Sequence, residues 1–72
     1  MNRSADRVRK RMASIVESHK DMLQDAVITM REGRLVLPLK EEYRGRIQGL
    51  IHDHSATGAT LFVEPFEIIE MN

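Results

Sequence analysis

The chain has 72 residues, equal numbers of acidic and basic side chains, and no cysteine. The lack of cysteine excludes a disulfide-stapled fold and a thiolate metal site. No apolar run exceeds five residues, which is too short for a membrane span or the core of a signal peptide. Hydrophobic residues make up 42% of the chain and aromatic residues 4%, so a small aliphatic core is possible. We therefore expect one small, soluble and cytoplasmic α+β unit.

The zero net charge hides an uneven distribution of charge along the chain. Residues 1–20 carry a net charge of +4, residues 21–51 are neutral, and residues 52–72 carry −4. A basic beginning of this kind can approach nucleic acid. It can also be the solvated face of a helix, and the sequence leaves both interpretations open.

Apolar residues at alternating spacings of three and four predict one helix over residues 4–23. The stripe consists of Ala5, Val8, Met12, Ile15, His19 and Met22. This a/d pattern is typical of a coiled-coil seam, and also of an amphipathic helix that packs on its own core. Because short hairpins cannot cover the whole stripe, we expect a homo-oligomer that forms through residues 5–23.

A change of the apolar period from helical to two predicts a first β-hairpin over residues 26–40. A two-residue turn at Glu32–Gly33 pairs Arg31 with Arg34, and the glycine supplies the positive φ that such a turn requires. Six apolar side chains then share one face of the hairpin: Ala26, Ile28, Met30, Leu35, Leu37 and Leu39.

A second hairpin is predicted over residues 48–64, after a charged connection at residues 41–47. Its turn falls at residues 55–58, and the apolar residues 66–72 begin a further element. The expected fold class is α+β, with a long N-terminal amphipathic helix followed by two antiparallel β-hairpins. All of residues 1–72 belong to this one unit.

The sequence His52-Asp53-His54 in the second hairpin is the sharpest candidate for a metal site. On a strand, His52 and His54 point to one face and Asp53 to the other. An H-x-H pair suits a metal ion, but the predicted register places Leu61 opposite His52 and offers no evident third ligand beyond a distant Glu64. We therefore expect no metal site and no catalytic residue in this chain.

Four segments of the chain follow the pattern of a known family, in the same order. Residues 28–40 (ITMREGRLVLPLK) resemble the family's ITIRNGRYVIPVK, and residues 42–44 (EYR) match its EYR. Residues 49–65 (GLIHDHSATGATLFVEP) resemble GIVHDxSxSGATLFIEP, and residues 69–72 (IEMN) resemble VELN. The chain thereby resembles the second bacterial MutS family, called MutS-two, over essentially its whole length. His54 and Leu35 depart from the pattern without disturbing the hairpins.

The resemblance implies a role within a longer protein. Members of the MutS-two family join a MutS-type ATPase to a small MutS-related nuclease domain, and are involved in recombination suppression or ribosome rescue. By this resemblance the chain is a non-catalytic internal piece of the core and clamp region, which approaches DNA. The chain has no G-x-x-x-x-G-K-[ST] phosphate loop, so we expect it to hold no cofactor. ATP and Mg²⁺ belong to other parts of such proteins.

Five cations in and after the first hairpin are the candidate contacts to the DNA backbone. They are Arg31, Arg34, Lys40, Arg44 and Arg46. Cations grouped in this way bind phosphate without reading bases. Taken alone they are more simply a solvated face, and the resemblance is what makes DNA contact an expectation. The ribosome is a second partner that the resemblance allows, and no membrane contact is expected. A self-contained dimerising module without a nucleic-acid role is the open alternative.

Overall fold

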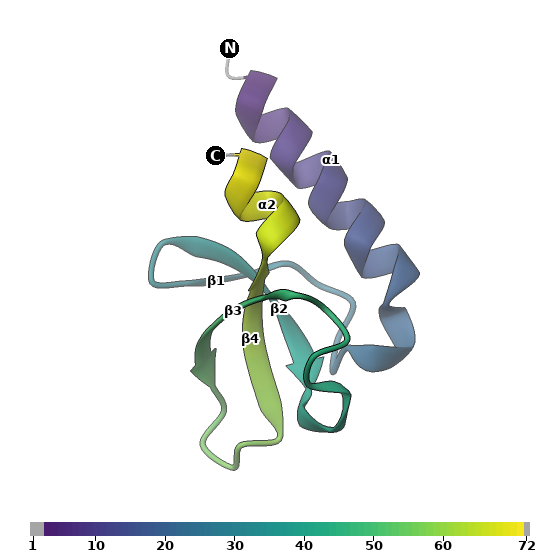
Figure 1. The fold of residues 1–72 in the computed structure, drawn as a ribbon, viewed down its shortest axis with the longest axis vertical. Coiled ribbons are helices and arrows are strands. Elements are labelled where there is room, and N and C mark those ends of the chain that lie inside the picture. Colours follow the sequence, from purple (N-terminus) through teal and green to yellow (C-terminus); the bar gives the residue numbers. More distant parts are fainter. Residues whose placement is uncertain (1–2, 72) are drawn as a thin grey trace.

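The computed structural model describes residues 3–71, which form two helices, two 3-10 turns and one four-stranded antiparallel sheet (Figure 1). In chain order the elements are α1 (Arg3–Ser18), η1 (Lys20–Met22), β1 (Thr29–Arg31), β2 (Arg34–Lys40), η2 (Glu41–Tyr43), β3 (Gly49–His54), β4 (Thr60–Pro65) and α2 (Phe66–Met71). The strand order is β1-β2-β4-β3. Helix α2 lies beside α1 at one end of the molecule, and α1 continues to the level of the sheet, where η1 follows it (Figure 1). Neither of the described helices is long and apolar enough to span a lipid bilayer.

The predicted architecture of a long helix followed by two separate hairpins is wrong, although the protein is an α+β unit. Strand β2 pairs with β4, from Leu37 opposite Val63 to Lys40 opposite Thr60, and this pairing joins both hairpins into one sheet. The segment expected to begin a further element forms α2, apart from residue 72, which lies outside the described residues. Pairing between hairpins depends on contacts that are distant in sequence, which a local period does not reveal.

The helix predicted over residues 4–23 ends at Ser18. The Ser18 hydroxyl donates a hydrogen bond of 3.1 Å to the carbonyl of Ile15, and Nδ1 of His19 lies 2.8 Å from the same oxygen. Polar side chains that bond to nearby carbonyls in this way compete with the helical backbone. The chain then turns through η1, and Leu23 is buried where it forms a bridge to β2.

The apolar stripe of α1 is covered within the molecule itself. Val8, Met12 and Ile15 are 6%, 0% and 8% exposed, and they share one core with the fully buried Ile68 of α2. The expectation of a largely uncovered stripe is therefore wrong for these residues, because the sequence pattern did not indicate a covering α2. The side chain of Ala5 lies outside the described part of the chain. Self-association through residues 5–23 stays a prediction, without the reason first given for it.

The turn of the first hairpin has the geometry that the sequence predicts. Glu32 and Gly33 both adopt positive φ values, 54° and 76°, which is the pattern of a type I′ turn. The predicted pairing of Arg31 with Arg34 is confirmed. This turn brings two arginines to the tip of the hairpin.

The single apolar face predicted for residues 26–40 is wrong on its first strand. Leu37 and Leu39 of β2 are buried, but Met30 of β1 is 55% exposed and Ala26 precedes the strand. The reason lies in the strand pairing, since β1 pairs only with the first half of β2, and β4 pairs with the second half. The β1 arm therefore extends beyond the part of the sheet that faces the helices (Figure 1).

The register predicted for the second hairpin is also wrong. His54, and not His52, pairs with Leu61, because the connection between the two strands is two residues longer than predicted. A β-bulge between Ile51 and Asp53 then shifts the register by one residue. A bulge breaks the strict alternation of side chains along a strand and redirects the residue that it adds. Its effect on the functional residues is described below.

Candidate nucleic-acid interface

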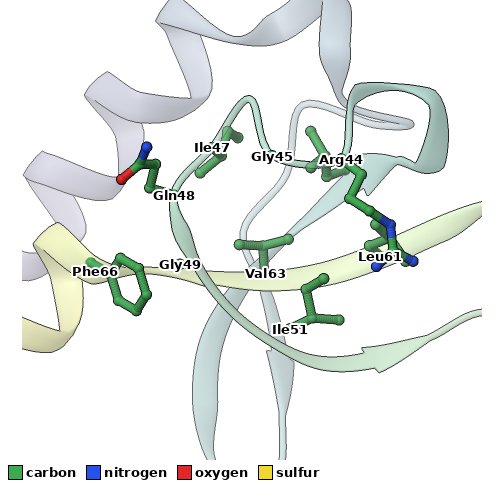
Figure 2. A pocket seen from close by; sticks show the side chains of 10 residues that line it. Arg44, Gly45, Ile47, Gln48, Gly49, Ile51, Leu61, Val63 and Phe66 are labelled. Carbon is green, nitrogen blue, oxygen red and sulfur yellow. The ribbon is translucent and has the colours of Figure 1, made fainter.

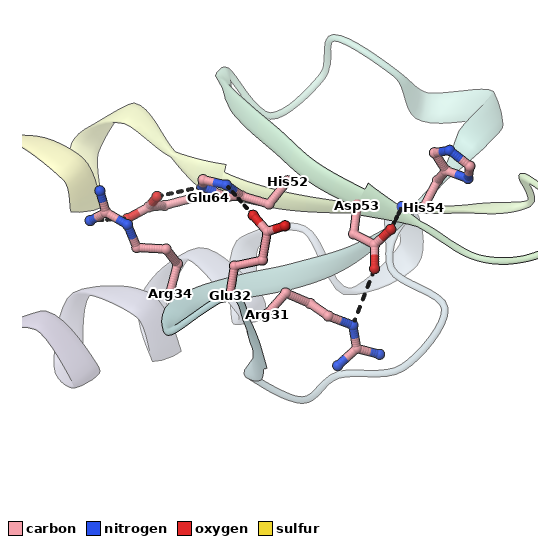
Figure 3. Close-up of polar contacts among 7 residues, drawn as sticks. All are labelled: Arg31, Glu32, Arg34, His52, Asp53, His54 and Glu64. Carbon is pink, nitrogen blue, oxygen red and sulfur yellow. Dashed lines mark hydrogen bonds and ion pairs between the residues drawn. The ribbon is translucent and has the colours of Figure 1, made fainter.

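Glu64 of β4 is a buried carboxylate at the centre of a polar cluster on one face of the sheet (Figure 3). We use the name polar cluster for Arg31, Glu32, Arg34, His52, Asp53 and Glu64. The carboxylate is 1% exposed and accepts a hydrogen bond of 2.7 Å from Nε2 of His52. Its second oxygen lies 3.6 Å from a guanidinium nitrogen of Arg34. A buried charge with these partners is compensated, whereas an unpaired one would be very costly.

The turn and the bulge together build this cluster. The type I′ turn places Glu32 so that its Oε2 lies 3.9 Å from Nδ1 of His52, on the far edge of the sheet. The bulge directs His52 toward Glu64 rather than toward the residue expected from simple alternation. The tip of the β1–β2 hairpin is thereby held against β3 (Figure 3).

Arg31, a candidate DNA contact, is held by neighbours of its own. Its Nε lies 3.8 Å from Oδ2 of Asp53, and its guanidinium carbon lies 4.3 Å from the centre of the Phe62 ring. Stacking of a guanidinium on an aromatic face contributes roughly 0.5–1 kcal/mol at an exposed site. Arg31 and Arg34 are thus both engaged by acids, so a phosphate would have to compete with Asp53 and Glu64.

The two histidines of the His52-Asp53-His54 sequence do not converge on one point. His52 contacts Glu64, whereas His54 points away from the polar cluster and its Nδ1 lies 3.1 Å from the carbonyl of Ser55 (Figure 3). The expected arrangement, with both histidines on one face and Asp53 on the other, is wrong because of the bulge. Within residues 3–71, no group of three or more His, Asp or Glu side chains is arranged to hold a metal ion.

The other three candidates, Lys40, Arg44 and Arg46, lie around the connection between β2 and β3. Lys40 is separated from Arg34 by the length of β2, which is about 20 Å at ~3.3 Å per residue. Arg44 forms an exposed ion pair of 3.7 Å with Glu41, and Arg46 is exposed. The structure therefore separates Arg31 and Arg34, at one end of β2, from Lys40 at its other end, and Arg46 lines a hollow with Glu67 and Glu70 of α2.

A hollow of about 300 Å³ lies beside the connection between β2 and β3 (Figure 2). Arg44 stands at its rim, and most of its lining is apolar. The apolar side chains are those of Leu39, Ile47, Ile51, Leu61, Val63 and Phe66. With Arg44 as its one charged side chain, the hollow offers little to hold a phosphate and suits apolar contact better.

Glu64 is the residue whose importance the sequence interpretation missed. It was considered only beside the two histidines of the candidate metal site, whereas it contacts His52 and Arg34. The available signal was a single acid in the apolar strand sequence Thr60–Pro65. An acid that is surrounded by strand-forming apolar residues is typically buried and paired.

Comparison with known proteins identifies the relatives of this chain. No family model matches it. Curated proteins named Endonuclease MutS2 do match, including that of Alkaliphilus oremlandii, at 51% identity over 69 residues and 93% of the chain. The protein of Caldanaerobacter subterraneus is 45% identical over 93% of the chain, and that of Listeria welshimeri is 45% identical over the whole chain.

The chain spans only 8–9% of the length of these relatives. The match nevertheless covers nearly every residue described above, from α1 through the sheet to α2. Identity near one half over such a share of the chain is the evidence for common ancestry. This chain belongs to the MutS2 family and corresponds to one segment of its longer members.

Proposed function

We propose that this chain is a non-catalytic structural segment that contacts the DNA backbone within a longer MutS2-type protein. The observation that carries the proposal is the match of 93% of the chain to proteins named endonucleases, which act on nucleic acid. In this proposal the chain belongs to the core and clamp region.

The cations beside η2 are the preferred contacts in this proposal. Lys40 ends β2 and Arg44 follows η2, where the acid Glu41 forms only an exposed pair of 3.7 Å with Arg44. Arg46 lies further along the connection, in a hollow that Glu67 and Glu70 of α2 also line. Exposed pairs contribute about 0–1 kcal/mol, so a phosphate can replace Glu41 at little cost. Arg31 and Arg34 are secondary contacts, because one is stacked on an aromatic ring and the other faces a buried acid.

ATP hydrolysis and DNA cleavage are assigned, in this proposal, to other parts of the longer protein. The residues of this chain do not fit ATP, since the sequence has no glycine-rich phosphate loop and no lysine in such a loop. The polar cluster does not offer a free base either, because its buried carboxylate is bound by His52 and Arg34. Recombination suppression and ribosome rescue are the two roles that we consider for the whole protein.

A dimerising interaction module remains the second candidate, and one observation favours it. Ile51 and Phe66 are 45% and 44% exposed, and both line the apolar hollow at the sheet. Exposed apolar residues that gather in one place tend to contact another protein. In this alternative the cations keep the module in solution and have no nucleic-acid partner.

Fluorescence anisotropy with labelled duplex and branched DNA separates the two candidates. Because the net charge is zero, we expect weak binding at low salt that is lost at physiological salt. Light scattering on the same samples measures the oligomeric state. A stable dimer that binds no DNA at low salt would support the interaction module instead.

A catalytic test accompanies the binding test. ATP hydrolysis and nicking of plasmid and branched DNA are measured for the 72-residue chain, with and without divalent metal ions. We expect no turnover. Reproducible turnover that is lost in both His52→Ala and His54→Ala would contradict the non-catalytic role.

A further inference from the structure

A further group of cations lies on α1, which carries none of the five candidates considered so far. Arg7, Lys10 and Arg11 are exposed and line a hollow of about 300 Å³, together with Ser14 and the end of α2 at Met71. The charged positions are three and four residues apart, so they lie on the same face of the helix. Part of the +4 charge of residues 1–20 therefore lies on this one face of α1 and is not spread evenly around the helix.

The charge of this surface is only partly compensated. Arg11 forms an ion pair of 3.7 Å with Glu67 of α2, in which both side chains are about half exposed. Among residues 3–71 no ion pair joins Arg7 or Lys10 to an acid, although Asp6 lies on a neighbouring part of the helix surface. The surface therefore presents roughly two uncompensated positive charges, and the 3.7 Å pair can open at little cost.

We infer that this face of α1 is a second contact surface for the phosphate backbone of duplex DNA. Arg7 and Arg11 are about 6 Å apart along the helix axis, at ~1.5 Å per residue, so successive side chains can follow a polyanion. Arginine binds phosphate through paired N–H groups, and the Ser14 hydroxyl adds a neutral donor of the kind that accompanies such contacts. A row of donors in an open hollow suits an extended backbone better than a compact ligand.

This inference goes beyond the proposed function, because it assigns contact to α1 rather than to the sheet. It rests on the proposed function in one respect: the proposed function is the reason for choosing DNA, and not an acidic protein segment, as the polyanion that binds. The two surfaces contain different residues, so each can be removed separately. Loss of one set of contacts therefore does not imply loss of the other.

The test uses the 72-residue chain and a short duplex DNA at low ionic strength, followed by amide chemical shifts in NMR. We expect the largest changes on α1 at residues 7–14, in addition to any at residues 40–46. The double variant Arg7→Gln/Lys10→Gln should lose the changes on α1. In an anisotropy titration it should also reduce the steepness of log affinity against log salt by about 1.8, for two lost phosphate contacts.

Arg9 provides a matched control on the same helix. It is exposed, it carries the same charge, and it does not line the hollow. It lies about 200° around the helix from Arg7 and from Arg11, at ~3.6 residues per turn. Arg9→Gln should leave the α1 shift changes in place and alter the salt dependence much less than the double variant does.

Three results would overturn the inference. One is an effect of Arg9→Gln at least half as large as that of Arg7→Gln/Lys10→Gln, which removes twice the charge, because overall charge and not this surface would then matter. A second is binding of a polyglutamate peptide to residues 7–14 as strong as that of DNA, which would indicate an acidic protein segment as the partner. The third is no change on α1 while residues 40–46 do change, in which case only this inference fails and the proposed function stands.

Discussion

The imidazole of His52 lies 2.7 Å from the carboxylate of Glu64, on neighbouring strands at the edge of the sheet. The same carboxylate faces Arg34 of β2, so one buried acid links three strands. The contact exists because the β-bulge directs His52 toward this carboxylate. Glu64 therefore determines how the hairpin tip, with two of the candidate DNA contacts, is held on the sheet.

The variant Glu64→Gln tests the importance of this buried charge. Glutamine keeps the shape of the side chain but removes the charge that faces His52 and Arg34. We expect the free energy of unfolding to fall by about 1.5–3 kcal/mol, the usual range for hydrogen bonds to charged groups. Chemical denaturation followed by circular dichroism measures the change.

Glu67→Gln is the matched control for that measurement. This variant makes the same change of side chain in an exposed ion pair, in which the Glu67 carboxylate lies 3.7 Å from the Arg11 guanidinium. We expect its free energy of unfolding to fall by less than about 1 kcal/mol. Equal losses in the two variants would show that burial of the Glu64 carboxylate has no special effect.

Gly49→Ala should destabilise the fold through a clash between backbones. A Cβ atom at Gly49 would clash with the carbonyl oxygen of Glu64 and would lie 2.8 Å from Cα of Pro65. Because these are backbone atoms of the paired strand, they cannot move aside cheaply, and we expect a loss of about 1–3 kcal/mol. Thermal melting gives the measurement, with the exposed neighbour Leu50→Ala as control. A Gly49→Ala protein as stable as Leu50→Ala would contradict the close approach of β3 to β4.

Glu32→Asn should stabilise the first hairpin. Glu32 has a φ of 54°, a conformation that asparagine adopts more readily than glutamate. We expect a gain of roughly 0.5 kcal/mol, in the range for relief of an unfavourable backbone conformation. The comparison with Glu32→Ala, which should lose stability, separates backbone preference from loss of the carboxylate. A loss of stability in Glu32→Asn would mean that the 3.9 Å contact from Glu32 to His52 matters more than the turn.

Ile15→Asp should unfold the chain rather than dissociate an oligomer. Ile15 is 8% exposed in the core between α1 and the rest of the molecule, so the substitution would bury a charge without a partner. We expect a loss of about 3 kcal/mol or more, which is comparable to the whole stability of a domain of this size. Ala13→Asp, on the exposed side of α1, should leave the melting transition nearly unchanged. A folded Ile15→Asp protein with half the mass of the parent would instead confirm a seam between two copies.

The parts of the fold that could be predicted are those with local causes. The type I′ turn follows from Gly33 between two strands of period two, and the pairing of Arg31 with Arg34 follows from the turn. The helical stripe likewise marks the buried residues Val8 and Met12. Each of these depends on neighbours within a few residues in the sequence.

The remaining features depend on contacts that the sequence pattern does not contain. The bulge at His52 is stabilised by the 2.7 Å contact to Glu64, on another strand, so alternation alone predicted the wrong face. The helix end at Ser18 depends on side chains that bond to the carbonyl of Ile15.

The salt dependence of DNA binding tests the central claim most directly. The variant Lys40→Gln/Arg44→Gln/Arg46→Gln is compared with the parent chain by anisotropy over a series of salt concentrations that begins at low ionic strength. If these side chains contact three phosphates, the steepness of log affinity against log salt should fall by about 2.7. An unchanged slope in a folded variant would contradict the claim that these side chains contact the DNA backbone.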